Sequence, residues 1–171
     1  MDVWRRCVAD FGIVIDYMAM LEVDTGRFTV GVFQDVAWAE KGLDALKHAG
    51  FLPESLTIVA KESAEVAALC TRTFGVAGDP LELPAVGTVL ARGPLLAALQ
   101  GASRDLGRLG LSGTMRRVGF QAHDGRIFEA LAGRGGILVA IHSEPRAAEA
   151  LSLLHSYGGG NAAIGAWTGR V

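Results

Sequence analysis

The side chains that could do acid–base or metal chemistry in this chain of 171 residues include four histidines. His142 and Glu144 lie two positions apart, and His155 follows later in the same stretch. If a helix joins Glu144 to His155, its rise separates them by roughly 16 Å. One metal ion cannot bind ligands spread over that distance, so we expect no metal site. We interpret these histidines as surface or half-buried residues.

His123 and Asp124 are adjacent, and such a pair could supply a general acid or base. The competing interpretation, which we favour, is that Asp124 caps the following helix while His123 belongs to a loop. The sequence has no Ser-His-Asp pattern, nucleophile elbow or close pair of carboxylates with an evident pocket. Catalytic residues are therefore unknown. A small enzyme that uses His142 or His123 as acid or base is the alternative to a non-catalytic protein.

The glycine run of residues 158–160, followed by Asn161, could hold a phosphate on its backbone amides. A phosphate loop leads from a strand into a helix, whereas this run leads from a predicted helix into a predicted strand. We interpret it as a helix stop and a turn. The sequence predicts no cofactor.

Composition indicates one globular domain that has no affinity for nucleic acid. Half of the residues are apolar and a fifth are charged, which is typical of a folded chain with a sizeable core. Sixteen basic residues against eighteen acidic ones give a net charge of −2. Phosphate backbones are bound by clustered Lys and Arg, and the longest basic cluster here is Arg116-Arg117.

Cysteine usage and hydropathy both favour a cytoplasmic protein. Cys7 and Cys70 are far apart among apolar neighbours, which predicts two buried thiols in a reducing compartment. We see no signal peptide, and a natural start later than Met1 stays open. Residues 150–169 have no formal charge, but His155 and the glycine run would place polar groups in lipid. We therefore expect no membrane span there.

The elements that must position these side chains include a unit that occurs twice. In the first copy, residues 28–33 predict a strand, Asp35 an N-cap, residues 36–49 a helix ending at Gly50, and residues 55–60 a second strand. The second copy predicts a strand over residues 137–142, a helix from Glu144-Pro145 to about residue 157, and a strand over residues 162–167.

Two βαβ units in tandem predict an α/β (α+β) fold: a duplicated, ferredoxin-like four-stranded sheet with helices on it. We divide the single domain, residues 1–171, into an N-terminal helix (1–25), the first unit (26–62), a helical insert (63–135) and the second unit (136–171). Residues 2–21 place apolar side chains at spacings of three and four, as an amphipathic helix does. In the insert, Ser63 caps a helix, residues 75–84 form a loop, and Pro94 begins a helix that extends to Leu106.

Three segments also carry a family resemblance: VGVFQDVAWAEKGLDALKHAGFLPESLTIVAKE near the start, LPAVGTVLARGPLLAAL in the centre and FEALAGRGGILVAIHS near the end. Together they resemble the bacterial general stress proteins, often labelled heat-induced stress proteins, over about residues 27–160. The resemblance implies a fold and no catalytic residue. Relatives commonly have a long Gly/Ala-rich insert after the first unit, and residues 71–84 here are short and charged. This difference argues against a membrane role.

The leading hypothesis is a non-catalytic, stress-associated cytoplasmic protein that binds a copy of itself, a partner or a small effector. We expect a homodimer or higher homo-oligomer. An exposed Trp38 would favour such an interface, although burial is the usual fate of tryptophan. A small anionic ligand would bind where the two strand-to-helix turns expose helix amides, at Gln34 and Asp35 and at His142, Ser143 and Glu144. A third hypothesis is a peripheral membrane protein held by residues 83–99 or by the N-terminal helix.

Overall fold

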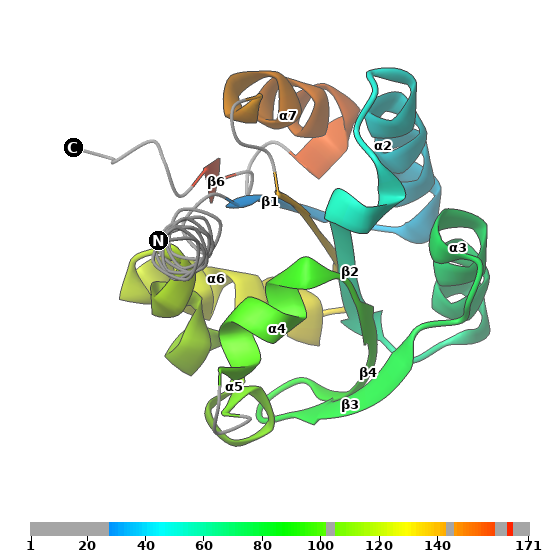
Figure 1. Cartoon of the computed structure of the whole chain (residues 1–171). Coiled ribbons are helices and arrows are strands. Elements are labelled where there is room, and N and C mark those ends of the chain that lie inside the picture. Colours follow the sequence, from blue (N-terminus) through cyan, green and yellow to red (C-terminus); the bar gives the residue numbers. More distant parts are fainter. Residues whose placement is uncertain (1–27, 102–104, 143–145, 160–163, 166–171) are drawn as a thin grey trace, which may run out of the picture.

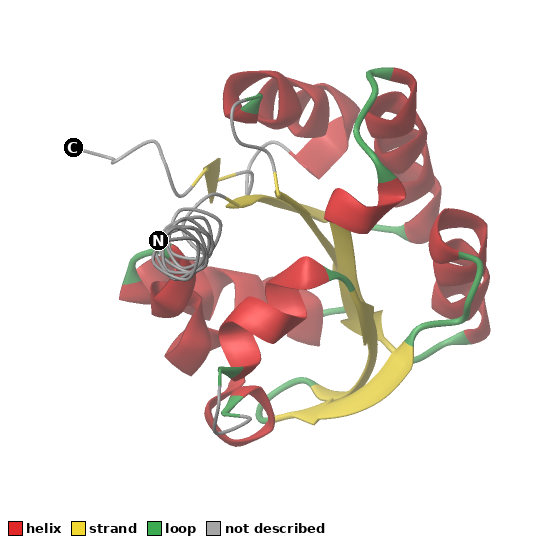
Figure 2. Cartoon of the chain, viewed as in Figure 1, coloured by secondary structure: helices red, strands yellow, loops and turns green. Residues whose placement is uncertain are grey.

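The computed structural model describes residues 28–101, 105–142, 146–159 and 164–165. Within these residues a single sheet of six strands separates two groups of helices (Figures 1 and 2). The strand order is β3-β4-β2-β5-β1-β6, and every neighbouring pair is antiparallel. The protein is therefore a mixed α/β fold, as the sequence predicts.

The described part of the chain forms six strands, six α-helices and three shorter helical segments. The strands are β1 (Phe28–Phe33), β2 (Leu56–Lys61), β3 (Asp79–Leu83), β4 (Gly87–Arg92), β5 (Ile137–His142) and β6 (Ile164–Gly165). The α-helices are α2 (Val36–His48), α3 (Ala64–Phe74), α4 (Pro94–Gln100), α5 (Leu106–Thr114), α6 (Ala122–Gly133) and α7 (Ala147–Leu154). Short 3-10 helices η1 (Pro53–Ser55) and η2 (Met115–Val118) and the π-helical turn η3 (His155–Gly159) complete them.

The two predicted units share the middle of the sheet. Strands β1 and β2 both pair antiparallel with β5, so they are parallel to each other with β5 between them. In the same way β5 and β6 are parallel, and β1 lies between them. Each unit thus inserts one of its strands between the two strands of the other.

Apolar side chains cover both faces of the sheet and form two cores. Helices α2, α3 and α7 lie on one face, and α4, α5 and α6 lie on the other (Figure 1). Strand residues alternate between the faces, as the two-residue period of a strand requires. Phe28, Val30 and Val32 belong to the core under α4–α6, while Phe33 belongs to the core under α2, α3 and α7.

The strands and the helix predicted for residues 28–60 are confirmed to within one residue. Oδ1 of Asp35 accepts a hydrogen bond from the amide of Trp38 at 2.9 Å, which makes Asp35 the N-cap of α2. The helix ends at His48, and Gly50 takes a left-handed φ of 96° just beyond it. The Ser63 side chain likewise accepts from the amide of Val66 at the start of α3.

The prediction for the insert is wrong in two respects, and the first is that the insert contains strands as well as helices. Residues 75–84 were expected to form a loop, but Asp79–Leu83 is the edge strand β3, and it forms a hairpin with β4. The described sheet consequently has six strands and not four. Pro80 and the charged residues Asp79 and Glu82 hide the strand in the sequence, because proline and charge are typical of sheet edges. The helix that begins at Pro94 also stops at Gln100, and Leu106 begins a separate helix.

The second repeat is confirmed where the structure describes it. Strand β5 covers residues 137–142 as predicted. Ser143, Glu144 and Pro145 lie outside the described residues, and α7 is described from Ala147. Of the predicted last strand, Ile164–Gly165 is described and pairs with β1. The predicted N-terminal helix lies outside the described residues.

Candidate functional site

The two turns proposed as a joint ligand site lie at opposite ends of the central strand pair. In the antiparallel register Phe33 faces Ile137, and Phe28 faces His142. Gln34 follows the first of these pairs, so it lies about six residues, or roughly 20 Å, from His142 along the strands. The structure therefore does not bring Gln34 and Asp35 together with His142, and one small ligand cannot touch all three residues.

The predicted residues that the structure describes lie in separate local environments. Asp35 is exposed and caps α2. Gln34 is exposed and lines a small pocket of about 340 Å³ with Val32 and Leu131. His142 is half-buried, and its ring centroid lies 5.1 Å from that of Phe28. Ser143 and Glu144 lie outside the described residues.

His123 and Asp124 form a helix start rather than an open acid–base pair. Asp124 is buried inside the first turn of α6 and accepts from the amide of Gln121 at 3.2 Å, so Gln121, not Asp124, is the N-cap. His123 belongs to the same helix and not to a loop, and its side chain is 58% exposed. Its Nε2 lies 3.2 Å from Oδ1 of Asp124. Neither His123 nor His142 lines either pocket described here.

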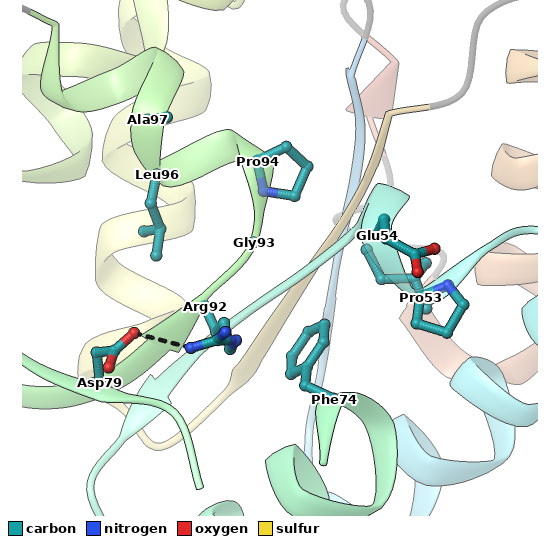
Figure 3. A pocket seen from close by; sticks show the side chains of 10 residues that line it. Pro53, Glu54, Phe74, Asp79, Arg92, Gly93, Pro94, Leu96 and Ala97 are labelled. Carbon is teal, nitrogen blue, oxygen red and sulfur yellow. Dashed lines mark hydrogen bonds and ion pairs between the residues drawn. The ribbon is translucent and has the colours of Figure 1, made fainter. Parts of the chain in front are cut away.

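A larger pocket lies where β4 turns into α4, beside the end of α3 and the 3-10 helix η1 (Figure 3). Its volume is about 630 Å³. Ten residues line it: Pro53, Glu54, Leu56, Phe74, Asp79, Arg92, Gly93, Pro94, Leu96 and Ala97. Pockets of a few hundred Å³ with mainly apolar walls and a few polar groups are typical of small-molecule sites.

The corner between β4 and α4 is fixed by Gly93. Its φ of 133° is one that residues with a side chain rarely adopt. A Cβ at this position would also collide with the Leu56 carbonyl and with Thr57 on the neighbouring strand. The buried Thr57 hydroxyl accepts from the amide of Leu95 at 3.1 Å and so holds the start of α4 against β2. Pro94 suits this first turn, where its missing N–H has no helical partner.

Arg92 is the single cation among the lining residues. Its Nη1 lies 3.4 Å from Oδ2 of Asp79, and the two side chains are 45% and 73% exposed. An ion pair this open contributes at most about 1 kcal/mol to stability. The guanidinium is consequently able to exchange Asp79 for another carboxylate at little cost.

The remaining lining side chains form an apolar wall. Four of these side chains are half-buried: Phe74, Pro53, Pro94 and Leu96. Leu56 is fully buried beneath them. Figure 3 shows the Phe74 ring beside the guanidinium of Arg92 and the Leu96 side chain on the α4 side of the pocket. A ligand with an apolar or aromatic body would remove this half-exposed surface from water.

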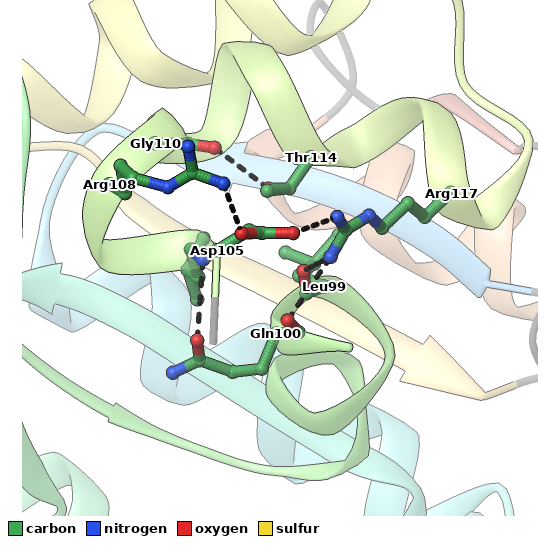
Figure 4. A network of polar contacts seen from close by, with 8 residues as sticks. Leu99, Gln100, Asp105, Arg108, Gly110, Thr114 and Arg117 are labelled. Carbon is green, nitrogen blue, oxygen red and sulfur yellow. Dashed lines mark hydrogen bonds and ion pairs between the residues drawn. The ribbon is translucent and has the colours of Figure 1, made fainter. Parts of the chain in front are cut away.

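The far end of α4 is held by a separate network around Asp105 (Figure 4). The Asp105 carboxylate accepts from Arg108 at 2.6 Å and also from Arg117. Arg117 donates in addition to the Leu99 and Gln100 carbonyls at 2.8 and 3.1 Å. Hydrogen bonds from Arg108 and Arg117 hold the pKa of Asp105 below its ordinary value. The network anchors α4, and with it Leu96 and Ala97, from the end opposite Gly93.

Sequence reasoning did not find the pocket because its residues come from six separate elements. Glu54, Phe74, Asp79 and Arg92 show no common motif or spacing. The one signal was Arg92-Gly93-Pro94, where a charge, a glycine and a helix-starting proline follow an apolar strand. The described residues contain no group of three or more His, Cys, Asp and Glu placed to hold a metal ion.

Comparison of the chain with protein-family models, with curated proteins and with solved structures finds no match. The assignment of a site therefore depends on the geometry above. Among the described helices, none is both long and apolar enough to cross a membrane.

Proposed function

We propose that the protein is a non-catalytic binding protein that takes a small, partly apolar effector into the pocket between β4, α4, α3 and η1. The observation that carries this proposal is one exchangeable guanidinium, Arg92, set in an apolar pocket of about 630 Å³. This place replaces the two strand-to-helix turns as the expected ligand site, because the register separates those turns.

The experiment that tests the proposal fills the pocket from its exposed rim. Ala97 lines the pocket and is exposed on α4, so Ala97→Trp should block binding without disturbing the core. The matched control is Ala130→Trp, an exposed alanine on α6. The probes are 4-(aminomethyl)benzoate, 4-methylbenzoate, 4-methylbenzylamine and benzyl alcohol, each followed by the NMR shifts of the amides of residues 92, 93 and 95–97.

At least one probe should move these amides in the wild-type and Ala130→Trp proteins and leave them unmoved in Ala97→Trp. If no probe moves them in the wild type, or if Ala97→Trp binds as the wild type does, the pocket is not a ligand site. Far-UV circular dichroism of each variant separates blocked binding from lost folding.

Self-association is the second function that an observation favours. Trp38, expected to be buried, is 46% exposed on α2, with Nζ of Lys41 4.6 Å from its ring centroid. Exposed tryptophan is enriched at protein interfaces, so Trp38 supports the proposed homo-oligomer. Native mass spectrometry should show an oligomer for the wild type and a weakened one for Trp38→Ser. Exposed Leu52→Ser is the matched control. A wild-type monomer at all concentrations contradicts this proposal.

The strand order supports the finer description of the fold. The order β6-β1-β5-β2, with each parallel pair split by a strand of the other unit, supports a duplicated βαβ, ferredoxin-like core.

The family resemblance supports a stress-associated role in the cytoplasm. Immunoblotting of the source cell before and after heat stress tests this role. Unchanged abundance in the soluble fraction, or recovery in the membrane fraction, would contradict it.

A further inference from the structure

We infer that the preferred ligand of this pocket is a zwitterion: a small apolar or aromatic body that carries both a carboxylate and an ammonium group. This inference rests on the proposed function and specifies its ligand class. It follows from the three charged side chains that line the pocket, Arg92, Glu54 and Asp79.

The carboxylate half of the inference comes from Arg92. Asp79 already offers this guanidinium a carboxylate, but through one long, solvent-exposed contact of 3.4 Å. A guanidinium presents parallel N–H groups that can bind a carboxylate through two hydrogen bonds at once. A ligand carboxylate that makes both bonds is therefore a better partner for Arg92 than Asp79 is.

The ammonium half comes from Glu54, which η1 places on another wall of the pocket (Figure 3). Glu54 is exposed and has no hydrogen bond or ion pair with the described part of the chain. Once a ligand displaces Asp79 from Arg92, the pocket has two carboxylates without a cationic partner. An ammonium group on the ligand is attracted by both.

The pairing of individual charged groups, and not the net charge of the lining, favours a ligand with both charges over the simpler ligands. Arg92 contributes +1 and the two carboxylates contribute −2, so the lining has a formal charge of −1. A ligand with a carboxylate alone gains Arg92 but is repelled by Glu54 and Asp79. A ligand with an ammonium alone pairs with Glu54 and leaves Arg92 with only its long, exposed contact to Asp79. A ligand with both charges pairs with Glu54 and also offers Arg92 a carboxylate that can accept two hydrogen bonds, while its apolar body covers Phe74 and Leu96.

Three compounds on one ring scaffold test this inference. In 4-(aminomethyl)benzoate a benzene ring has a carboxylate and an ammonium; 4-methylbenzoate keeps the carboxylate alone, and 4-methylbenzylamine keeps the ammonium alone. Dissociation constants from NMR titration of the full chain at low salt should show the zwitterion binding at least tenfold more tightly than either relative. Phenylalanine, with both charges on one carbon, reports whether a closer charge spacing fits better.

Two variants assign the charges to their partners. Arg92→Gln should weaken the zwitterion to the level of the amine, and Glu54→Gln should weaken it to about the level of the carboxylate. Exposed Arg126→Gln and Glu65→Gln are the matched controls and should bind as the wild type does.

The outcomes separate this inference from the function on which it rests. If 4-methylbenzoate or 4-methylbenzylamine binds as tightly as the zwitterion, the inference is wrong and the binding function stands. If only benzyl alcohol moves the pocket amides, the inference is wrong and the binding function stands. If the three charged compounds, phenylalanine and benzyl alcohol all leave the pocket amides unmoved, both are wrong. If the zwitterion binds equally well to Arg92→Gln and Glu54→Gln, the assignment of its charges to this pocket is overturned.

Discussion

Asp79 and Arg92 lie on neighbouring antiparallel strands, with Oδ2 of the carboxylate 3.4 Å from Nη1 of the guanidinium. The contact occupies the one cationic group of the pocket with a carboxylate of the chain itself. Asp79 is therefore an internal competitor for any ligand carboxylate, and its removal should strengthen binding.

We expect Asp79→Asn to raise the affinity for 4-methylbenzoate about three- to fivefold, the equivalent of an exposed ion pair of up to about 1 kcal/mol. The gain should shrink as salt is added, because exposed charges are screened. NMR titration at two salt concentrations measures both effects. The exposed Asp44→Asn is the control and should leave affinity unchanged. Equal affinity in wild type and Asp79→Asn would show that the ion pair does not compete.

Gly93 makes the corner that forms the pocket, so its substitution should damage both stability and binding. Gly93→Ala forces a side chain into a φ of 133° and against Leu56 and Thr57. We expect a loss of about 2 kcal/mol or more in the free energy of unfolding, measured by urea denaturation.

Gly75→Ala isolates the backbone contribution to that loss. Gly75 also has a left-handed φ, of 81°, but a Cβ there would meet nothing within 4 Å. Its substitution should cost about 1 kcal/mol, which is the cost of a helix C-cap in this conformation without glycine. If Gly93→Ala costs no more than Gly75→Ala, the contact between β4 and β2 is not the constraint that sets the corner.

The sequence predicted the repeated units because their signals are local. The cap at Asp35, the stop at Gly50 and the apolar strand over residues 137–142 are each defined by residues within a few positions of one another. The relation between the units is not local. Because β1 and β5 pair antiparallel, Gln34 and His142 lie toward opposite ends of this strand pair. The symmetry of the sequence suggested one ligand site near both residues, but the fold separates them.

The pocket could not be predicted for the same physical reason. Glu54 and Arg92 are far apart in the chain, and they line one pocket only because β4 pairs with β2. Strand β4 also belongs to the β3–β4 hairpin, whose edge strand shows proline and charge in place of a strand pattern. Trp38 was expected to be buried because tryptophan usually is, yet its position beside the apolar stripe of α2 leaves it half-exposed.

Asp105 should make stability fall in acid. Hydrogen bonds from Arg108 and Arg117 lower the pKa of this carboxyl in the folded chain. A lowered folded pKa gives stability that is fully present above the ordinary value of about 4 and is lost as pH falls through the folded pKa. Asp105→Asn should therefore lower the urea midpoint at pH 7, and the difference from wild type should shrink as pH falls below 4. A constant Asp105→Asn difference between pH 7 and pH 3 would contradict the ion-pair account.

Cys70 should be an inert thiol until the chain unfolds. It is a fully buried residue of α3, and burial raises the pKa of its thiol because the thiolate would lose its water. Since the thiolate is the reactive form, Ellman's reagent should modify Cys70 in urea far faster than in buffer at pH 8. A Cys7→Ser background makes Cys70 the only thiol in the measurement. Equal modification rates with and without urea would show that Cys70 is accessible in the folded protein.

The raised pKa of the folded Cys70 thiol also means that the thiol ionises first in the unfolded chain as pH rises. The free energy of unfolding should then decline above about pH 8.5, and Cys70→Ala should remove this decline.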